Sequence, residues 1–372
     1  MPRSKFPPIV KQPVHPVEAV KGRGMTWAMP HRFSLDEREA FDDGWGTEDQ
    51  LVAEEHLPPA TQIIEERVKS IISSNESPDI PFEHSVNPYR GCEHGCIYCY
   101  ARPTHSYLNL SPGLDFETKI VAKVNAAERL VEELRKRSYV PSAINLGAAT
   151  DCYQPVERKL GLTRAVLEVL ARCEHPFTIV TKSSGVERDI DLIAPASQRS
   201  QAAVFVSITS LDSELSRIME PRAAAPHRRL QTVRRLSEAG IPVGVNVAPI
   251  IPFINEPEIE RIVDAACEAG AKSIHWTVVR LPWEVAPLFH QWLEQHFPQR
   301  AERVMARIRD MRHGKDYDAD FASRMKGDGL WSALIRQRIE KARGRHGRES
   351  TRYELDSSRF RPPEPPGQGS LF

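Results

Sequence analysis

The stretch Cys92-Glu93-His94-Gly95-Cys96-Ile97-Tyr98-Cys99 contains three of the six cysteines of this 372-residue chain. Its C-x3-C-x2-C spacing allows one short loop to place three thiolates around a single inorganic centre. Thiolates are soft ligands that select zinc or iron–sulfur clusters. A cubane cluster has four irons, so three cysteines leave one iron open for reaction, whereas a structural zinc site needs a fourth protein ligand.

The alternative interpretation of this loop is a structural zinc knuckle with His94 or Cys152 as the fourth ligand. Zinc sites usually show paired C-x2-C or Cys/His groups, and the sequence has no second pair of this kind. Cys173 and Cys267 fall in predicted helices, where we expect buried thiols. The pattern therefore favours a cluster.

The charges of the chain are balanced overall but unevenly distributed. Lys+Arg and Asp+Glu both number 50. Residues 36–55 hold nine acids against one base, and residues 331–361 hold nine Lys/Arg against four acids. Such runs are commonly solvated tails, and a nucleic-acid-facing C-terminal region is the sharper hypothesis. No apolar run reaches the 18 residues of a membrane span and no signal pattern is present, so we expect a cytoplasmic protein.

From about residue 81, short apolar runs alternate with amphipathic helices. Strands are expected at 84–89, 143–146, 177–181, 203–208, 242–248 and 272–279. Helices are expected between them at 117–137, 161–172, 186–194, 228–239 and 257–269. Six β–α units in series predict parallel strands with crossover helices, and thus an α/β fold, a partial (β/α)6 TIM-like barrel.

The pattern divides the chain into four parts. Residues 1–80 are expected to form a partly disordered N-terminal extension with one helix at 60–72. Residues 81–285 form the core, and residues 286–345 a helical C-terminal appendage. Residues 346–372 are expected to be a flexible tail that is basic and rich in proline.

The cysteine loop resembles that of the radical S-adenosylmethionine (radical SAM) superfamily. This resemblance implies a 4Fe-4S cluster whose open iron binds S-adenosylmethionine. It further implies that the reduced cluster cleaves this molecule to a 5′-deoxyadenosyl radical, which takes a hydrogen from the substrate. The resemblance also implies a flavodoxin- or ferredoxin-like reductant.

Polar or small residues follow the later predicted strands, where parallel barrels place their chemistry. Thr150 and Asp151 suit the ammonium group of S-adenosylmethionine, and Lys182 suits its carboxylate. Ser207 could reach a ribose, and Ala248, next to a proline, could shape an adenine slot.

These segments are most similar to the spore photoproduct lyase branch of the superfamily. The similarity rests on Thr150-Asp151, Thr181-Lys182 and the run Ala239–Ile250. It implies that Thr150, Lys182 and Ser207 contact S-adenosylmethionine, with Tyr98 and Tyr100 flanking it.

The sequence departs from that branch at one position. The lyase has a hydrogen-donating cysteine three residues before its Asp, where this chain has Ala148. Cys152 is the candidate donor here. The substrate is therefore open: nucleic acid, a protein or a small molecule, or no reaction at all in a zinc- or cluster-stabilised module that associates with nucleic acid.

The chain ends in Gln368-Gly369-Ser370-Leu371-Phe372. This peptide is similar to the sliding-clamp-docking peptide of bacterial repair and replication proteins, although Gly369 replaces the usual leucine. With the basic stretch before it, it favours DNA as a partner.

Overall fold

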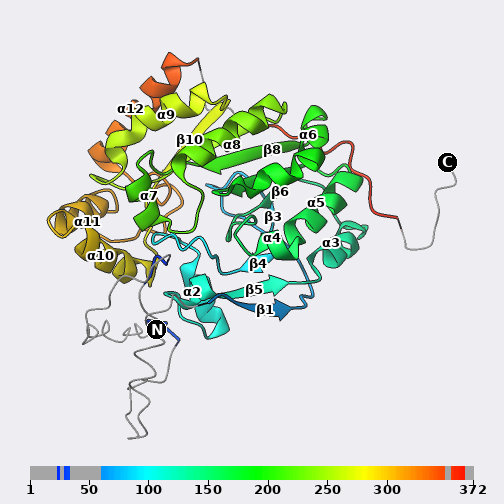
Figure 1. Ribbon diagram of the computed structural model, residues 1–372, viewed down its shortest axis with the longest axis horizontal. Helices are drawn as coiled ribbons and strands as arrows, with labels where there is room; N and C mark the ends of the chain where they lie inside the picture. The colour runs from blue at the N-terminus through cyan, green and yellow to red at the C-terminus, as the bar shows by residue number, and fades with distance from the viewer. Residues whose placement is uncertain (1–22, 26–28, 34–59, 348–352, 365–372) are drawn as a thin grey trace, which may run out of the picture.

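The computed structural model describes residues 23–25, 29–33, 60–347 and 353–364. At its centre lies an open seven-stranded sheet in the order β10-β9-β8-β7-β6-β3-β2 (Figure 1). Six of its strands are parallel: β3 (His84–Val86), β6 (Ile144–Leu146), β7 (Phe177–Thr181), β8 (Ala202–Ser207), β9 (Val243–Ile250) and β10 (Ser273–Val278). The short β2 (Ile72–Ser74) pairs antiparallel with β3 at the edge.

Helices connect the parallel strands in chain order. These are α3 (Ala126–Leu134), α4 (Glu157–Leu160), α5 (Leu162–Arg172), η2 (Ser184–Asp189), α6 (Ile190–Gln198), α7 (Ser213–Met219), α8 (Pro226–Glu238), η3 (Glu256–Glu258) and α9 (Ile259–Glu268). Strand β8 is buried along almost its whole length, as expected for a parallel strand covered on both faces. The partial (β/α)6 barrel predicted from the sequence is confirmed.

A second, three-stranded sheet corrects two helix predictions. It has the order β1-β5-β4, with β1 (Gln62–Glu66), β5 (Lys119–Lys123) and β4 (Tyr89–Arg90). The helix expected at 60–72 is wrong, and the one expected at 117–137 is confined to α3 and preceded by α2 (Asp115–Thr118) and β5. Both errors have the same cause: Ile63-Ile64 and Ile120-Val121 are β-branched pairs, which favour strands where a partner edge is available.

A helical appendage follows β10, as predicted, with α10 (Val285–His296), α11 (Ala301–Asp310) and α12 (Gly329–Arg345). Helix α12 packs against α9. Arg338 pairs with Glu260 at 2.7 Å and Arg345 with Asp264 at 2.9 Å. Part of the basic charge of residues 331–361 is therefore paired with acidic side chains of the same chain at the protein surface.

The last described segment, residues 353–364, packs on the core and corrects the prediction of a flexible tail there. The Tyr353 hydroxyl donates to the Val243 carbonyl at 3.2 Å, and the Asp356 amide to the Ser200 carbonyl at 2.8 Å. Phe360 lies edge-on to His175, with ring centroids 5.1 Å apart. These contacts place the segment across the N-terminal ends of the parallel strands. The C-terminal peptide Gln368–Phe372, predicted to resemble a clamp-docking peptide, lies outside the described residues.

Buried His175 gives the fold a specific dependence on pH. Its Nδ1 lies 2.9 Å from the Pro176 carbonyl, to which a neutral ring donates, and its Nε2 accepts from the Tyr139 hydroxyl at 2.7 Å. Burial lowers the pKa of His175 from 6.5 to about 4. Below pH 6.5 the unfolded chain therefore binds a proton that the folded protein does not. As the pH falls from 6.5 to 4, His175 lowers the free energy of unfolding by about 3 kcal/mol at most.

We expect His175→Gln to be less stable than the wild type at pH 7, because it loses these contacts. The difference should shrink at pH 4.5, where the wild type has lost stability through His175. Urea unfolding at both pH values measures this, with exposed His227→Gln on α8 as the control. A difference that is the same at both pH values would contradict the prediction.

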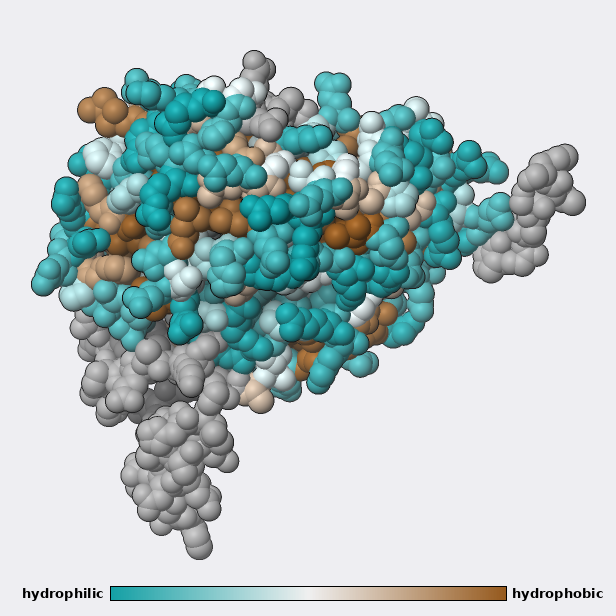
Figure 2. Space-filling view, turned by 45° about the horizontal axis from the view of Figure 1, so that its top comes forward, coloured by the Kyte–Doolittle hydropathy of each residue, from teal (hydrophilic) through white to brown (hydrophobic). Residues whose placement is uncertain are grey.

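The described surface is largely hydrophilic in the view of Figure 2, with hydrophobic side chains in small separate areas. In the part of the chain that the structure describes, no helix is long and apolar enough to cross a membrane.

Two strands, β1 and β2, come from the segment 1–80, and β2 extends the central sheet.

Candidate active site

The cysteine loop follows β3 at the C-terminal end of the sheet. Backbone hydrogen bonds hold it from both sides: Cys92 N–H donates to the Phe116 carbonyl at 2.9 Å, and Ile97 N–H to the Met219 carbonyl at 3.1 Å. Gly95 turns the loop at φ +67°, where a Cβ would lie 2.8 Å from Glu117 Oε2. The three cysteines are therefore held on a fixed, tightly packed turn.

A buried ion pair packs against this turn and stabilises it. Arg102 and Glu117 are both fully buried and lie 2.5 Å apart. Arg102 also donates to the Cys96 carbonyl at 3.0 Å, and Glu117 accepts from the Gly24 amide at 2.9 Å. Burial raises the pKa of Glu117 and the guanidinium of Arg102 opposes the rise. Sequence reasoning missed this pair because nothing in the local pattern links the two residues.

The thiols fit an iron–sulfur cluster in their chemistry and surroundings. Cys92 and Cys96 are buried and Cys99 is half-buried. Burial raises the pKa of the Cys92 thiol, and that of Cys96 to about 12, and neighbouring thiols add to both shifts, so the three thiols lie within electrostatic reach of one another. Lys182 and Arg229 oppose the shift at Cys96 and would favour anionic thiolate ligands there.

Among the described residues, no three His, Cys, Asp or Glu side chains are arranged to hold one metal ion. A cubane cluster needs no such convergence, because each thiolate binds a different iron.

A second buried charge cluster lies beside Cys96, centred on Glu220. Its carboxylate accepts hydrogen bonds from Arg229, from the Thr209 hydroxyl at 2.6 Å and from the Tyr98 hydroxyl. Burial raises the pKa of Glu220, but Arg229 and Lys182 outweigh it and hold the pKa at about 2. The Tyr98 side chain, predicted to flank S-adenosylmethionine, is thus bonded to Glu220.

Lys182 is the predicted site residue whose surroundings best match its predicted role. Burial lowers the pKa of Lys182, but the charges of the nearby Cys96 and Glu220 outweigh this effect. The pKa of Lys182 is therefore above its ordinary value. Its ammonium group lies 5.9 Å from the centre of the Tyr98 ring. Lys182 is therefore a cation beside Cys96, a predicted cluster ligand.

Thr150 and Asp151 connect three loops of the site. The Thr150 hydroxyl donates to the Tyr89 carbonyl at 3.1 Å. Asp151 accepts from the Thr181 hydroxyl and the Lys182 amide, both at 2.7 Å, and lies 3.3 Å from His94 Nδ1. Burial raises the pKa of Asp151, and His94 with these hydrogen bonds lowers it to about 2.

The remaining predicted cofactor residues lie at the ends of later strands or over them. Ser207 ends β8, and its carbonyl accepts from Arg229 at 3.1 Å. The Ala248 carbonyl accepts from the Thr209 hydroxyl at 3.3 Å. Tyr100 is 47% exposed, donates to the Ala148 carbonyl and carries the Arg280 guanidinium 4.3 Å from its ring centre. The structure thus gathers these side chains around one end of the sheet, and their contacts to S-adenosylmethionine stay predictions.

Cys152, the predicted hydrogen donor, has no exposed surface and belongs to the hydrophobic core. Its carbonyl accepts from the Thr163 hydroxyl at 2.6 Å. Burial, followed by the charges of Asp151 and Glu157, raises its thiol pKa well above the usual value. The structure shows a thiol packed in the core, and its donor role stays a prediction.

Comparison with known proteins gives the class. Residues 86–266 match the family model of the radical SAM superfamily. This domain therefore belongs to that superfamily, whose members use a 4Fe-4S cluster and S-adenosylmethionine. Cys92, Cys96 and Cys99 are the residues that would hold the cluster.

The chain is similar to several uncharacterized proteins. One from Mycobacterium tuberculosis is 36% identical over 226 residues, which cover 60% of this chain and 66% of that protein, just under two thirds. Another, from Methanocaldococcus jannaschii, is 27% identical over 65% of this chain and 86% of its own length.

Among solved structures, the fold is similar to spore photoproduct lyase. A complex of that lyase with dinucleoside spore photoproduct superposes with a TM-score of 0.51, at 16% identity, over 76% of this chain and 79% of the other. A double mutant of the same lyase holds AdoMet as well, with the same score and coverage. The predicted likeness to this branch is confirmed at the level of the fold.

Proposed function

We propose that this protein is a radical SAM enzyme that acts on nucleic acid. One observation carries the enzyme class: a loop with three cysteines at the C-terminal end of six parallel strands, with no fourth cysteine in it. When bound, the cluster and S-adenosylmethionine would supply a 5′-deoxyadenosyl radical that abstracts hydrogen from the substrate. A flavodoxin- or ferredoxin-like protein would supply the electron.

The residues of this chain would bind and orient the cosubstrate. Lys182, a cation beside Cys96, would pair with the carboxylate of S-adenosylmethionine. Thr150 and Asp151 would position its amino group, and Ser207 and Ala248 would lie along the nucleoside. The buried Glu220–Arg229 pair would help to keep Lys182 positively charged beside Cys96.

An exposed group of aromatic side chains beside the site favours a nucleic-acid substrate. We call Phe33, Tyr107 and Trp283 the aromatic rim; they are 51%, 68% and 63% exposed. The Arg32 guanidinium lies 4.7, 5.4 and 4.6 Å from their ring centres. It is held by Glu284 through two hydrogen bonds of 3.0 and 2.8 Å.

The position of the aromatic rim in the chain supports a role in contacting a nucleic-acid strand near the site. Tyr107 follows the cysteine loop in η1 (Arg102–Leu108), and Trp283 follows β10. Arg280, stacked on Tyr100, adds a positive charge at the same end of the sheet. Exposed aromatic rings with arginines are how proteins hold single-stranded nucleic acid, because each base can stack on a ring. The structural likeness to a lyase that holds a dinucleoside photoproduct supports the same substrate class.

The test is an anaerobic assay of the reconstituted, dithionite-reduced protein with S-adenosylmethionine. We expect release of 5′-deoxyadenosine, with a rate that rises when ultraviolet-damaged single-stranded DNA is added. Stimulation by a protein or small-molecule fraction but not by DNA would contradict the substrate class while leaving the enzyme class intact.

Trp283→Ala should weaken binding of a single-stranded oligonucleotide by about 1–3 kcal/mol, since one stacked base loses its platform. Fluorescence anisotropy with a labelled oligonucleotide measures the effect. Val140→Ala, at a residue 74% exposed and remote in sequence from the rim, is the control and should leave affinity unchanged. Equal affinities for Trp283→Ala and the wild type would remove the aromatic rim from the binding surface.

A further inference from the structure

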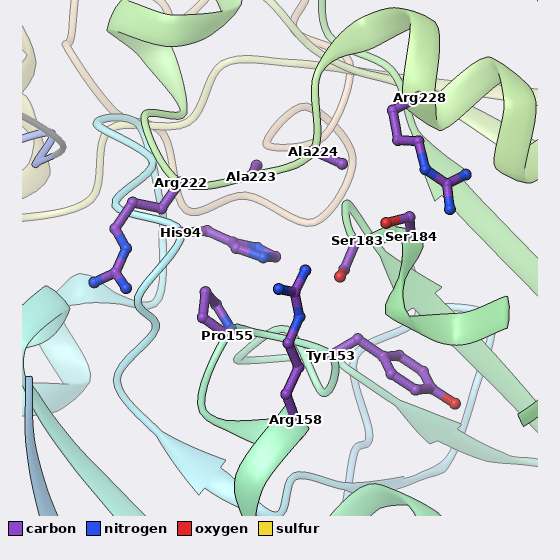
Figure 3. A pocket seen from close by; sticks show the side chains of 10 residues that line it. All are labelled: His94, Tyr153, Pro155, Arg158, Ser183, Ser184, Arg222, Ala223, Ala224 and Arg228. Carbon is purple, nitrogen blue, oxygen red and sulfur yellow. The ribbon is translucent and has the colours of Figure 1, made fainter. Parts of the chain in front are cut away.

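A cavity of about 180 Å³ lies beside the cysteine loop, which lines it with His94. The residues of interest in its wall are His94, Arg158, Ser183, Ser184, Arg222 and Arg228. They come from four segments: the cysteine loop, the start of α4, the start of η2, and the stretch that leads into α8 together with the first turn of that helix. In Figure 3 the Arg158 guanidinium reaches into the space between His94 and Ser183.

The cavity carries an excess of positive charge. Three arginines line it, and none of the residues in its wall is Asp or Glu. Arg222 pairs with Glu93 at 3.2 Å and Arg228 with Glu187 at 2.5 Å, so both are anchored from outside the wall. Within the described part of the chain, the Arg158 guanidinium has neither an ion pair nor a hydrogen bond. The exposed Arg158 guanidinium thus has no partner in the described part of the protein, and it lies in a space that two anchored arginines border.

Hydroxyl groups complete the set of donors. The Ser183 hydroxyl accepts from the Gly185 amide at 3.0 Å, which leaves its own O–H free to donate into the cavity. Ser183 is 8% exposed, so this donor is fixed in a packed wall. Ser184 adds a second hydroxyl at the wall. A planar guanidinium beside hydroxyl donors is matched to a tetrahedral oxyanion, and the volume accommodates one.

We propose that this cavity binds a phosphate group. Its position makes the site part of the catalytic end of the molecule: His94 lies between two cluster ligands in sequence, and its carbonyl accepts from the Arg222 amide at 3.3 Å. A phosphate held there lies beside the cysteine loop. It belongs either to a nucleic-acid backbone or to a small phosphorylated ligand. Only the first source rests on the proposed function.

The experiment measures binding to the reconstituted full-length protein by isothermal titration calorimetry, without turnover. The probes are inorganic phosphate, a DNA dinucleotide with one phosphodiester, and the corresponding unlinked nucleosides. The variants are Arg158→Gln, which removes the charge, and Arg158→Lys. The lysine variant keeps the charge but loses the planar guanidinium with its paired N–H donors. The matched control is Arg137→Gln, an exposed arginine in the turn after α3.

We expect phosphate to bind the wild type and Arg137→Gln equally, and Arg158→Gln about 10-fold more weakly or worse, with Arg158→Lys in between. The same loss with the dinucleotide identifies nucleic acid as the source, and a loss with inorganic phosphate alone identifies a small ligand; both support the site. Absence of phosphate binding, or equal affinities for Arg158→Gln and the wild type, overturns it.

A protein partner is the competing occupant. If Arg158→Gln slows reduction of the cluster by an acidic flavodoxin while phosphate does not bind, the cavity belongs to reductant docking and the phosphate assignment is overturned. Because binding is measured without S-adenosylmethionine, failure of this site is distinguishable from failure of the proposed function.

Discussion

Cys96→Ala is expected to abolish cluster binding and with it the release of 5′-deoxyadenosine. The loop then keeps two cysteines, too few to hold a cubane with one open iron. Iron per chain after anaerobic reconstitution should fall from about four to near zero, and the brown colour should be lost. Iron analysis, the visible spectrum and chromatography of the adenosyl product measure the three effects.

The control for this substitution is Cys173→Ala. Cys173 is a buried thiol at the end of α5, away from the cysteine loop in sequence. We expect this variant to retain iron and activity, although the lost side-chain volume lowers stability somewhat. A colourless wild type that holds one zinc per chain, with or without Cys96, would refute the cluster and the enzyme class together.

The second large effect is expected from Arg229→Met. Arg229 is 1% exposed, and its guanidinium bonds to Glu220, to the Ser207 carbonyl at 3.1 Å and to the Ala224 carbonyl at 2.6 Å. Its removal leaves the Glu220 carboxylate buried with less compensation. Breaking such a pair costs about 3–5 kcal/mol of unfolding free energy. Urea denaturation of the reconstituted protein measures the loss.

Two further variants show whether the effect comes from the charge. Arg229→Met with Glu220→Gln should recover part of the stability, because the uncompensated carboxylate is gone. Arg234→Met on the same helix removes an exposed arginine and should change stability by no more than about 0.5 kcal/mol. Equal losses for Arg229→Met and Arg234→Met would mean that the buried pair contributes nothing specific.

The series of parallel strands could be predicted from the sequence because short runs rich in apolar and β-branched residues recur between amphipathic helices. The cysteine loop could be predicted because its ligands are close in sequence. The three-stranded sheet could not, since β1 becomes a strand only when β5 is beside it, and the partner strands are about 57 residues apart.

The buried ion pairs that support the site also could not be predicted from the sequence. Arg102 and Glu117, and Glu220 and Arg229, look like ordinary surface residues in a linear pattern, and only packing shows that each pair is buried. The same holds for the aromatic rim, where Arg32 and Trp283 meet across some 250 residues.

The segment 353–364 determines how the molecule can be held in an experiment. It leaves the core beside α3, where Arg135 donates to the carbonyls of Pro363 and Glu364, at the end of the barrel that faces away from the cysteine loop (Figure 1). An affinity handle attached beyond residue 364 would therefore anchor the protein at the end of the barrel opposite the cysteine loop. On a sensor surface the end with the cysteine loop would face the solution, open to the proposed oligonucleotide ligand.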